Sequence, residues 1–241
     1  MLPKAGSSSF KEQKALISRF IKDFGKENIL GILGDREFSC GSLLEWLNKE
    51  KIGFYIRIKE NTMVHIRQNK LSCAKRIFKQ IKPKQHHFFG MTVWVFGEKV
   101  YLAASRSEQR ELMIIATNKD PRLAIAIYLR RWEIETLFGS LKSKGFRFEE
   151  THMTQLDRIN KLMTVLAIGF CWAHKVGEWR ALKKPITLKK HANTLRPQNN
   201  YFRYGLDFIR ELILNPFKKY HEFKRCLSAL VPTPTQLPIF L

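Results

Sequence analysis

The sequence predicts an α/β fold that is interrupted by a β-rich block and followed by a mainly helical region. Three patterns support this prediction. A strand, a helix and a second strand alternate over residues 28–58, an order typical of parallel α/β arrangements. Short apolar runs at 92–96, 99–103 and 112–116 indicate antiparallel strands. Residues 156–180 and 202 to about 230 follow a predominantly helical pattern.

A loop and then a helix open the chain, and we expect the helix to run from about Phe10 to Gly25. Ser9 is the candidate N-cap of this helix, and Gln13 lies close to the position of a capping-box partner. The apolar run at residues 28–33 then predicts a short buried strand.

Asp35 directly follows this strand, within the segment Gly34-Asp35-Arg36-Glu37. The carboxyl ends of parallel strands are where α/β folds place ligand-binding groups, so Asp35 is a candidate site residue. The alternative is a turn residue with no role beyond the turn. A helix over 42–50 and a strand over 54–58 come next.

The β-rich block spans residues 59–118. Gly97-Glu98 separates its first two strands and is expected to form a hairpin turn. Trp94 is the only tryptophan in the block, and we expect it to pack as a core aromatic beside Phe96.

A long helix is predicted after the block, with Asp120 as its N-cap, Pro121 at its first position and Gly145 as its stop. One face of this helix carries four polar side chains: Tyr128, Arg131, Glu135 and Lys142. At about 100° per residue they fall within an arc of roughly 60°. The spacing alone also allows an ordinary amphipathic surface helix, in which Arg131 and Glu135 form an i, i+4 ion pair.

The composition favours a polyanionic partner. Lys and Arg number 43 against 21 Asp and Glu, so the net charge is +22. Nucleic acid is the leading candidate, and an anionic membrane surface is the alternative. No strongly basic amphipathic anchor stands out, so a membrane partner is not expected. The most apolar run, residues 162–173, is too short to span a bilayer and predicts a buried helix.

The two carboxylates suggest a metal site. If the long helix packs beside the first strand, Asp35 and Glu135 converge. Their oxygens suit Mg²⁺ or Mn²⁺, and paired ions of this kind support in-line phosphoryl transfer. Tyr128, Arg131 and Lys142 would then hold phosphates beside the metal.

These residues resemble a known signature. Tyr128, Arg131, Glu135 and Lys142 fit a Tyr-x2-Arg-x3-Glu-x6-Lys pattern, and residues 34–37 are similar to its Asp-Arg-Glu segment. The chain thus resembles the DDE transposases of bacterial cut-and-paste insertion sequences, from the first helix to about residue 180.

The resemblance implies a ribonuclease-H-like fold in which three acidic residues bind two divalent ions and act on double-stranded DNA at transposon ends and targets. It makes Asp35 the second acid and Glu135 the third, with Tyr128, Arg131 and Lys142 on the DNA backbone. In related enzymes an insertion-domain tryptophan stabilises a flipped base, but Trp94 cannot be aligned to that role.

The implied domains are a catalytic core over 1–58 and 119–150, a β-rich insertion over 59–118 and a helical C-terminal region over 151–241. The implied partners are DNA and either a second copy or a full-length transposase. The implied location is the bacterial cytoplasm, associated with the nucleoid.

One part of the family pattern is missing. The first acid belongs on an initial strand, but the only upstream aspartate is Asp23, at the end of the first predicted helix. We therefore expect an incomplete core that exposes a sheet edge and self-associates, and a truncated transposase with little cleavage of its own. The alternative is a non-catalytic fragment that binds DNA or inhibits the full-length enzyme.

Overall fold

The computed structural model describes residues 7–67, 70–142, 145–191, 194–215, 217–230 and 239–240. The chain divides into two compact units. The β unit contains Lys4–Trp132 and Thr235–Leu241, and the helical unit contains Met1–Pro3 and Glu133–Pro234.

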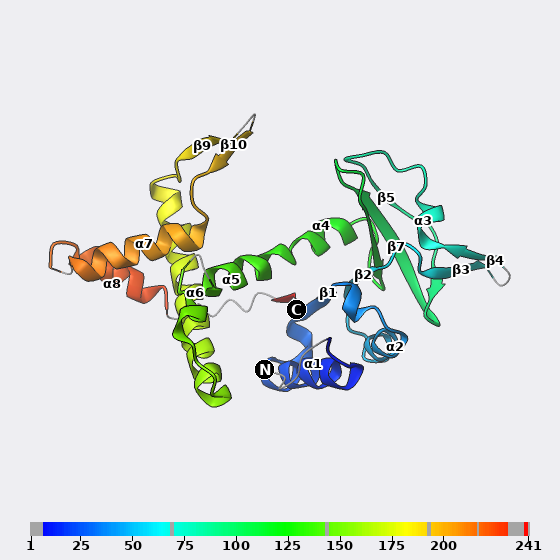
Figure 1. Cartoon of the computed structure of the whole chain (residues 1–241), viewed down its shortest axis with the longest axis horizontal. Coiled ribbons are helices and arrows are strands. Elements are labelled where there is room, and N and C mark those ends of the chain that lie inside the picture. The colour runs from blue at the N-terminus through cyan, green and yellow to red at the C-terminus, as the bar shows by residue number, and fades with distance from the viewer. Residues whose placement is uncertain are drawn as a thin grey trace. The chain divides into compact units, whose positions relative to one another are not determined.

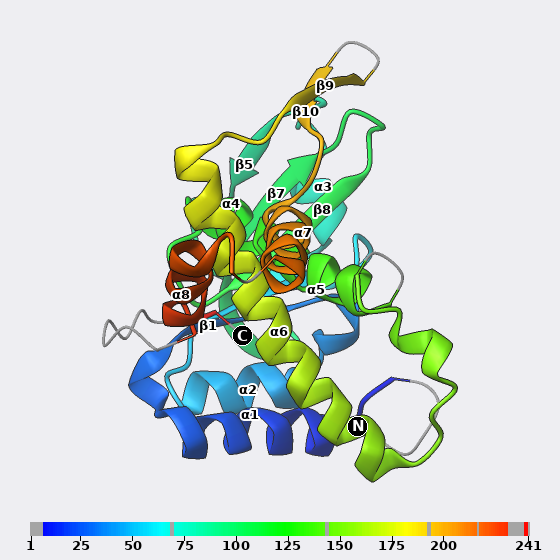
Figure 2. The same ribbon diagram turned by 90° about the vertical axis from the view of Figure 1, so that its left-hand side faces the viewer.

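The β unit begins with the predicted alternation. Its first elements are α1 (Phe10–Phe24), η1 (Lys26–Asn28), β1 (Ile29–Gly34), η2 (Arg36–Phe38), α2 (Gly41–Lys49) and β2 (Phe54–Ile58). Strands β1 and β2 are parallel, with Ile32 opposite Phe54, as the strand–helix–strand order predicted. Helices α1 and α2 lie side by side (Figure 2).

Ser9 is the N-cap of α1, which confirms the prediction, but the capping-box partner is Glu12 rather than Gln13. The Glu12 carboxylate accepts the Ser9 backbone N–H at 2.6 Å. Gln13 instead turns inward, where it is buried and its amide donates to the carbonyl of Ser8 at 3.2 Å.

The β-rich block is antiparallel, as expected. Its elements are β3 (Met63–Arg67), β4 (Lys70–Cys73), α3 (Ala74–Ile77), β5 (His86–Phe88), β6 (Val93–Val95), β7 (Glu98–Arg106) and β8 (Leu112–Thr117). Strand β8 pairs antiparallel with β2, so strands of the predicted core and of the predicted insertion lie in one sheet. The domain boundaries themselves remain a prediction.

Within the described residues this sheet has nine strands, in the order β11-β1-β2-β8-β7-β6-β3-β4, with β5 paired to β7. Strand β11 (Ile239–Phe240) lies parallel to β1, opposite Ile29 and Gly31. Part of the β1 edge that we expected to be exposed is therefore paired.

Side chains alternate between the two faces of the sheet, and both faces are covered. On β2, Phe54, Ile56 and Ile58 join the main core with α1 and α2. Tyr55 points to the opposite face, where it packs with Ala124 and other residues of α4 (Ala124–Leu129). Helix α4 is therefore anchored on the sheet beside β2, β7 and β8 (Figure 1).

The hairpin between β6 and β7 differs from the prediction by one residue. Val95 pairs with Glu98, so Phe96 and Gly97 form the turn, and both have positive φ (51° and 85°). Trp94 is 50% exposed between two buried valines, and Phe96 is also exposed. The expectation of a core tryptophan is wrong because the alternation of β6 turns Trp94 outward.

The predicted long helix is two helices. Helix α4 ends at Leu129, and α5 (Trp132–Lys142) begins after a turn at residues 130–131. Asp120 does not cap α4, whose N-cap is Leu123. Its carboxylate instead accepts the Arg122 backbone N–H at 2.9 Å and forms an ion pair with the Arg122 guanidinium at 2.6 Å. The predicted stop at Gly145 follows residues 143–144, which lie outside the described residues.

The helical unit is built on α6 (Leu156–Lys183), α7 (Tyr201–Leu214) and α8 (Tyr220–Ser228). It also contains η3 (Phe148–Thr151) and the hairpin strands β9 (Leu188–His191) and β10 (Thr194–Pro197). Its core includes Ala173, Val176, Phe202, Leu212 and Cys226.

Helices α6 and α7 cross in close contact at two glycines. A Cβ built on Gly177 would lie 1.9 Å from the Tyr201 carbonyl oxygen, and one on Gly205 would lie 1.9 Å from that of Ala173. Only glycine fits at this crossing.

The apolar run over residues 162–173 lies on α6, as a helix, but it is not fully buried: Val165 and Ile168 are 64% and 58% exposed. None of the described helices combines the length and hydropathy that crossing a membrane requires. The sequence of residues 231–241, with three prolines, predicts a tail that runs over the surface; residues 231–238 lie outside the described part, and Ile239–Phe240 form β11.

Candidate functional site

Asp35 stands at the carboxyl end of β1, where it starts the short helix η2. Its Oδ1 accepts the Arg36 backbone N–H at 2.8 Å and so caps η2. Among the described residues this is the only hydrogen bond of the carboxylate, and the side chain is half-buried. Oδ2 is therefore available to a cation.

Tyr128 lies on α4 and is 2% exposed, packed with Tyr55 and Ile115 against the sheet. Burial raises the pKa of its hydroxyl, and the negative charge of Asp35 raises it further. The positive charges of Arg131 and Arg57 act in the opposite direction. Tyr128 therefore shares its electrostatic environment with the carboxylate at the end of β1.

Arg131 is at the turn between α4 and α5. Its guanidinium carbon is 5.8 Å from the centroid of the Tyr128 ring. At this position its positive charge lowers the pKa of the Tyr128 hydroxyl. Within the described residues this hydroxyl is buried without a hydrogen bond of normal geometry. A buried hydroxyl in this state favours an acceptor such as a phosphate oxygen.

Arg57 joins this group, and the sequence reasoning missed it. It lies on β2 and shares its face with Tyr55, toward α4. The signal in the sequence was a single arginine inside the apolar strand Phe54–Ile58. Asp35, Arg57, Tyr128 and Arg131 thus gather around one end of the β1–β2 pair.

Glu135 and Lys142 lie on α5, in the helical unit, and both side chains are exposed. They are seven residues apart, so they share a face of that helix to within about 20°. Lys142 Nζ forms an exposed ion pair with Glu149 Oε1 at 3.2 Å. Such a pair contributes little stability, so a phosphate could replace it.

The structure therefore brings together only part of the predicted set. Asp35, Tyr128 and Arg131 belong to the β unit, whereas Glu135 and Lys142 belong to the helical unit. The break between α4 and α5 means that the four signature side chains do not share a continuous helix. The meeting of Asp35 with Glu135 stays a prediction.

Asp35 and Glu135 each carry a donor type that fits a hard divalent cation. Asp35 offers a half-buried carboxylate and Glu135 an exposed one, and carboxylate oxygens are the preferred ligands of Mg²⁺ and Mn²⁺. In the described residues no three His, Cys, Asp or Glu side chains already lie close enough to hold a metal. Asp23 is exposed on α1 and does not join Asp35.

Comparison with known protein families gives one match. The family described as the transposase DDE domain matches residues 5–172. This stretch contains all five predicted site residues and ends before the β9–β10 hairpin. No curated protein matches the chain.

Proposed function

Because the chain belongs to the transposase DDE domain family, we propose that it acts in DNA transposition, in the insertion-sequence branch that carries the Tyr-x2-Arg-x3-Glu-x6-Lys signature. The reaction would be metal-dependent DNA cleavage followed by strand transfer. The observation that carries this proposal is the strand-end Asp35, beside Tyr128 and Arg131, in a chain that also holds Glu135 at the signature spacing.

Asp35 and Glu135 are the proposed metal ligands. Mg²⁺ or Mn²⁺ bound there would activate the attacking oxygen and stabilise the leaving oxygen. The capping bond from the Arg36 N–H fixes Asp35 Oδ1, so the carboxylate is oriented before any ion binds. Residues that orient a ligand in this way lower the cost of forming the site.

The cations would position the DNA. Arg131 and Lys142 are suited to phosphate oxygens through charge-assisted hydrogen bonds, and Tyr128 can donate its hydroxyl proton. We add Arg57 to this set because its positive charge lowers the pKa of the Tyr128 hydroxyl. Trp94, exposed on β6, has the stacking surface that an unpaired base requires.

A second function has its own observation. In the described β unit, the aspartate upstream of Asp35 is Asp23, which is exposed on α1 rather than at the end of a strand, so the proposed ligand set has two carboxylates, Asp35 and Glu135. Two ligands hold a cation more weakly than three. The alternative is therefore a non-catalytic protein that binds element DNA, or pairs with a complete transposase, without cutting.

A nicking assay separates the two functions. The chain is incubated with Mg²⁺ and DNA from the ends of its own element, and Glu135→Gln is compared with Glu133→Gln, which changes a neighbouring glutamate of α5. Nicking that is lost in Glu135→Gln and kept in Glu133→Gln supports catalysis through Glu135. Salt-sensitive DNA binding without nicking supports the second function, and nicking unaffected by Glu135→Gln contradicts the proposed site.

A further inference from the structure

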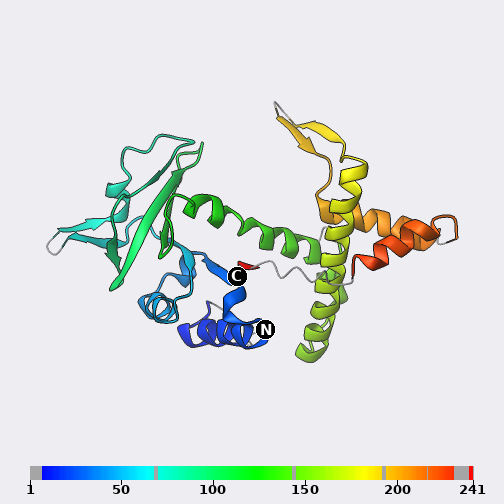
Figure 3. The same cartoon turned by 180° about the vertical axis from the view of Figure 1, so that it is seen from behind.

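The β9–β10 hairpin is the most isolated part of the helical unit. It connects α6 to α7 and extends away from both helices (Figures 1 and 3). Among the described residues its two strands pair only with each other. None of the hairpin side chains that the structure describes belongs to the core of the unit. A two-stranded ribbon without a packed face is marginally stable in water, so its sequence points to a partner.

One face of the hairpin carries like charges opposite each other. The register places Lys189 directly across from Arg196, and both side chains are exposed. Like charges at directly opposed positions destabilise an antiparallel pair. No acidic side chain among the described residues pairs with either cation. A bound polyanion would attract both cations and so offset the repulsion between them.

The sequence around the hairpin strengthens the positive potential. Between Glu178 and Asp207 there is no acidic residue. The same stretch contains these cations: Arg180, Lys183, Lys184, Lys189, Lys190, Arg196 and Arg203. The nearest acidic residue after the hairpin, Asp207, forms ion pairs with Arg203 at 2.9 Å and with Arg210 at 4.0 Å, both on its own helix. Three of these seven cations, Lys189, Lys190 and Arg196, lie on the ribbon, and the others lie on or next to α6 and α7.

The opposite face of the hairpin is partly apolar. Leu188 and Leu195 are 55% and 67% exposed, and they alternate with the cations along the strands. A ribbon inserted in a groove is covered on both faces, which would bury these leucines as well as the charges. The major groove of B-DNA is wide enough for a two-stranded β-ribbon, whose flanking cations then meet phosphates.

We propose that the β9–β10 hairpin is a separate DNA-binding arm that enters a groove of duplex DNA and places Lys189 and Arg196 on its phosphates. The arm lies outside the stretch that the family match covers, residues 5–172. The inference rests on the proposed function only in taking duplex DNA as the partner, because it does not require cleavage.

The test measures how DNA binding depends on salt. A mixed-sequence DNA duplex is titrated with the full chain, and the binding constant is followed as the NaCl concentration rises. Each phosphate contact contributes about 0.9 to the slope of log K against log salt. The double substitution Lys189→Ala and Arg196→Ala should make this negative slope shallower by about 2. It should also weaken DNA binding by about tenfold or more.

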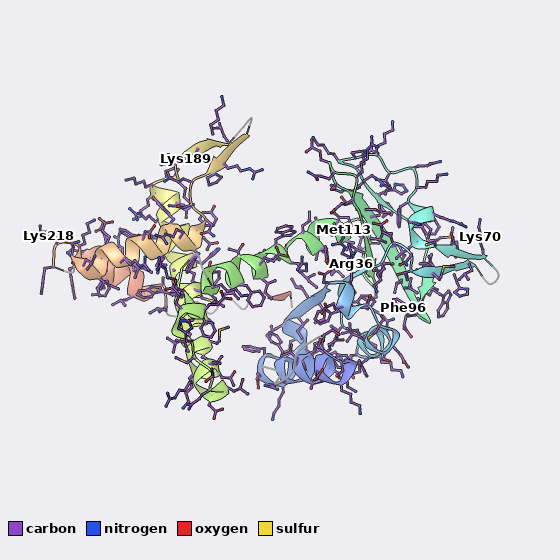
Figure 4. All side chains as sticks on the ribbon, viewed as in Figure 1. Arg36, Lys70, Phe96, Met113, Lys189 and Lys218 are labelled. Carbon is purple, nitrogen blue, oxygen red and sulfur yellow. The ribbon has the colours of Figure 1, made fainter. Side chains whose placement is uncertain are left out.

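The control removes the same charge elsewhere. Lys218→Ala with Lys224→Ala changes two exposed lysines of the helical unit. Lys189 and Lys218 lie at different ends of that unit (Figure 4). The control should keep the slope of the unaltered chain. Both pairs of substitutions are at exposed positions, so thermal denaturation should show no loss of stability, and relief of the Lys189–Arg196 repulsion should slightly favour the hairpin.

Four results would overturn the proposal. If the hairpin variant binds DNA normally with an unchanged slope of log K against log salt, the hairpin is not a DNA-binding arm, but the proposed function still stands. Equal losses in the hairpin and control variants show that net charge, not the hairpin, sets binding. Hairpin-dependent binding to phosphatidylserine vesicles, with unaltered DNA binding, assigns the arm to a membrane surface. If the full chain shows no salt-dependent DNA binding, both proposals fail.

Discussion

At the scale of single residues, Tyr128 is the position where packing and the candidate site meet. Its ring packs in the core beside α4, and its hydroxyl experiences the charges of Asp35, Arg131 and Arg57. Burial is the main reason that its pKa is raised. The stability of the β unit is therefore linked to the protonation of the Tyr128 hydroxyl.

We expect the stability of the β unit to fall at alkaline pH through this group. A raised folded-state pKa favours the protonated hydroxyl, so its contribution is complete below the ordinary value of about 10 and is lost as pH rises through the folded-state pKa. Tyr128→Phe removes this titration. Urea unfolding followed across the alkaline range should show a shallower decline for Tyr128→Phe, with the remaining decline due in part to buried Tyr55. Identical curves for both chains would contradict this account.

Some of these residues were predictable from the sequence and others were not. The position of Asp35 at the end of β1 was predictable because the apolar run before it indicates a buried strand, whereas its role as a ligand stays a prediction. Asp120 was not predictable, because its carboxylate pairs with Arg122 two residues later and so is not the cap of a helix. Trp94 was misjudged because period-two alternation fixes which residues share a face, not which face is covered.

At the scale of elements, the turn between β6 and β7 contains a residue that does not suit its conformation. Phe96 has φ 51° and precedes Gly97 at φ 85°, the pattern of a type I′ turn. Left-handed backbone costs a non-glycine residue roughly 1 kcal/mol, and asparagine tolerates it best. Phe96→Asn should therefore raise the free energy of unfolding by about 0.5–1 kcal/mol in urea denaturation. A loss of stability would show that the exposed ring makes a contact that outweighs the strain.

The crossing of α6 with α7 gives the sharpest prediction for the helical unit. Gly177→Ala places a methyl group against the Tyr201 carbonyl oxygen, which only a shift of the helices can relieve. We expect a destabilisation of about 3 kcal/mol. Gly169→Ala on the same helix is the control, because its Cβ would lie 3.3 Å from the end of the Phe146 ring. Calorimetry should show a lowered transition for Gly177→Ala only, and equal effects would refute the close crossing.

The type of an element, helix or strand, was predicted correctly more often than its boundaries. The alternation of β1, α2 and β2 was clear because the apolar runs and the turn residues between them agree there. The break between α4 and α5 left no signal, since neither proline nor glycine marks residues 130–131. The cause is tertiary: Ala124, Ile125 and Tyr128 hold α4 on the sheet, and the chain passes to the helical unit at Trp132.

At the scale of the whole molecule, the excess of positive charge is the feature that both proposals share. A net charge of +22 makes a polyanionic partner the expected one, and the family match makes that partner DNA. Composition predicted the partner class but not where the charges lie. The hairpin shows why, since its opposed cations become visible only when the register of β9 and β10 is known.

The sheet was predicted in its parts but not as a whole. Local patterns identified most of its strands, but the pairing of β2 with β8 joins residues about sixty positions apart in the chain. The pairing of β1 with β11 joins residues that are farther apart still. Pairings at this separation depend on tertiary packing, so the sequence patterns do not specify them.

The central claim, that Asp35 and Glu135 hold the same divalent cation, is tested most directly by a double-mutant cycle on Mn²⁺ affinity. Free Mn²⁺ is measured by electron paramagnetic resonance in the presence of DNA, for Asp35→Asn, Glu135→Gln and the combined variant, with Glu133→Gln as control. If the ion is shared, each single change weakens binding by about tenfold or more and the combination weakens it little further. Independent effects that multiply in the combined variant, or a Glu135→Gln affinity equal to that of the control, would contradict the claim.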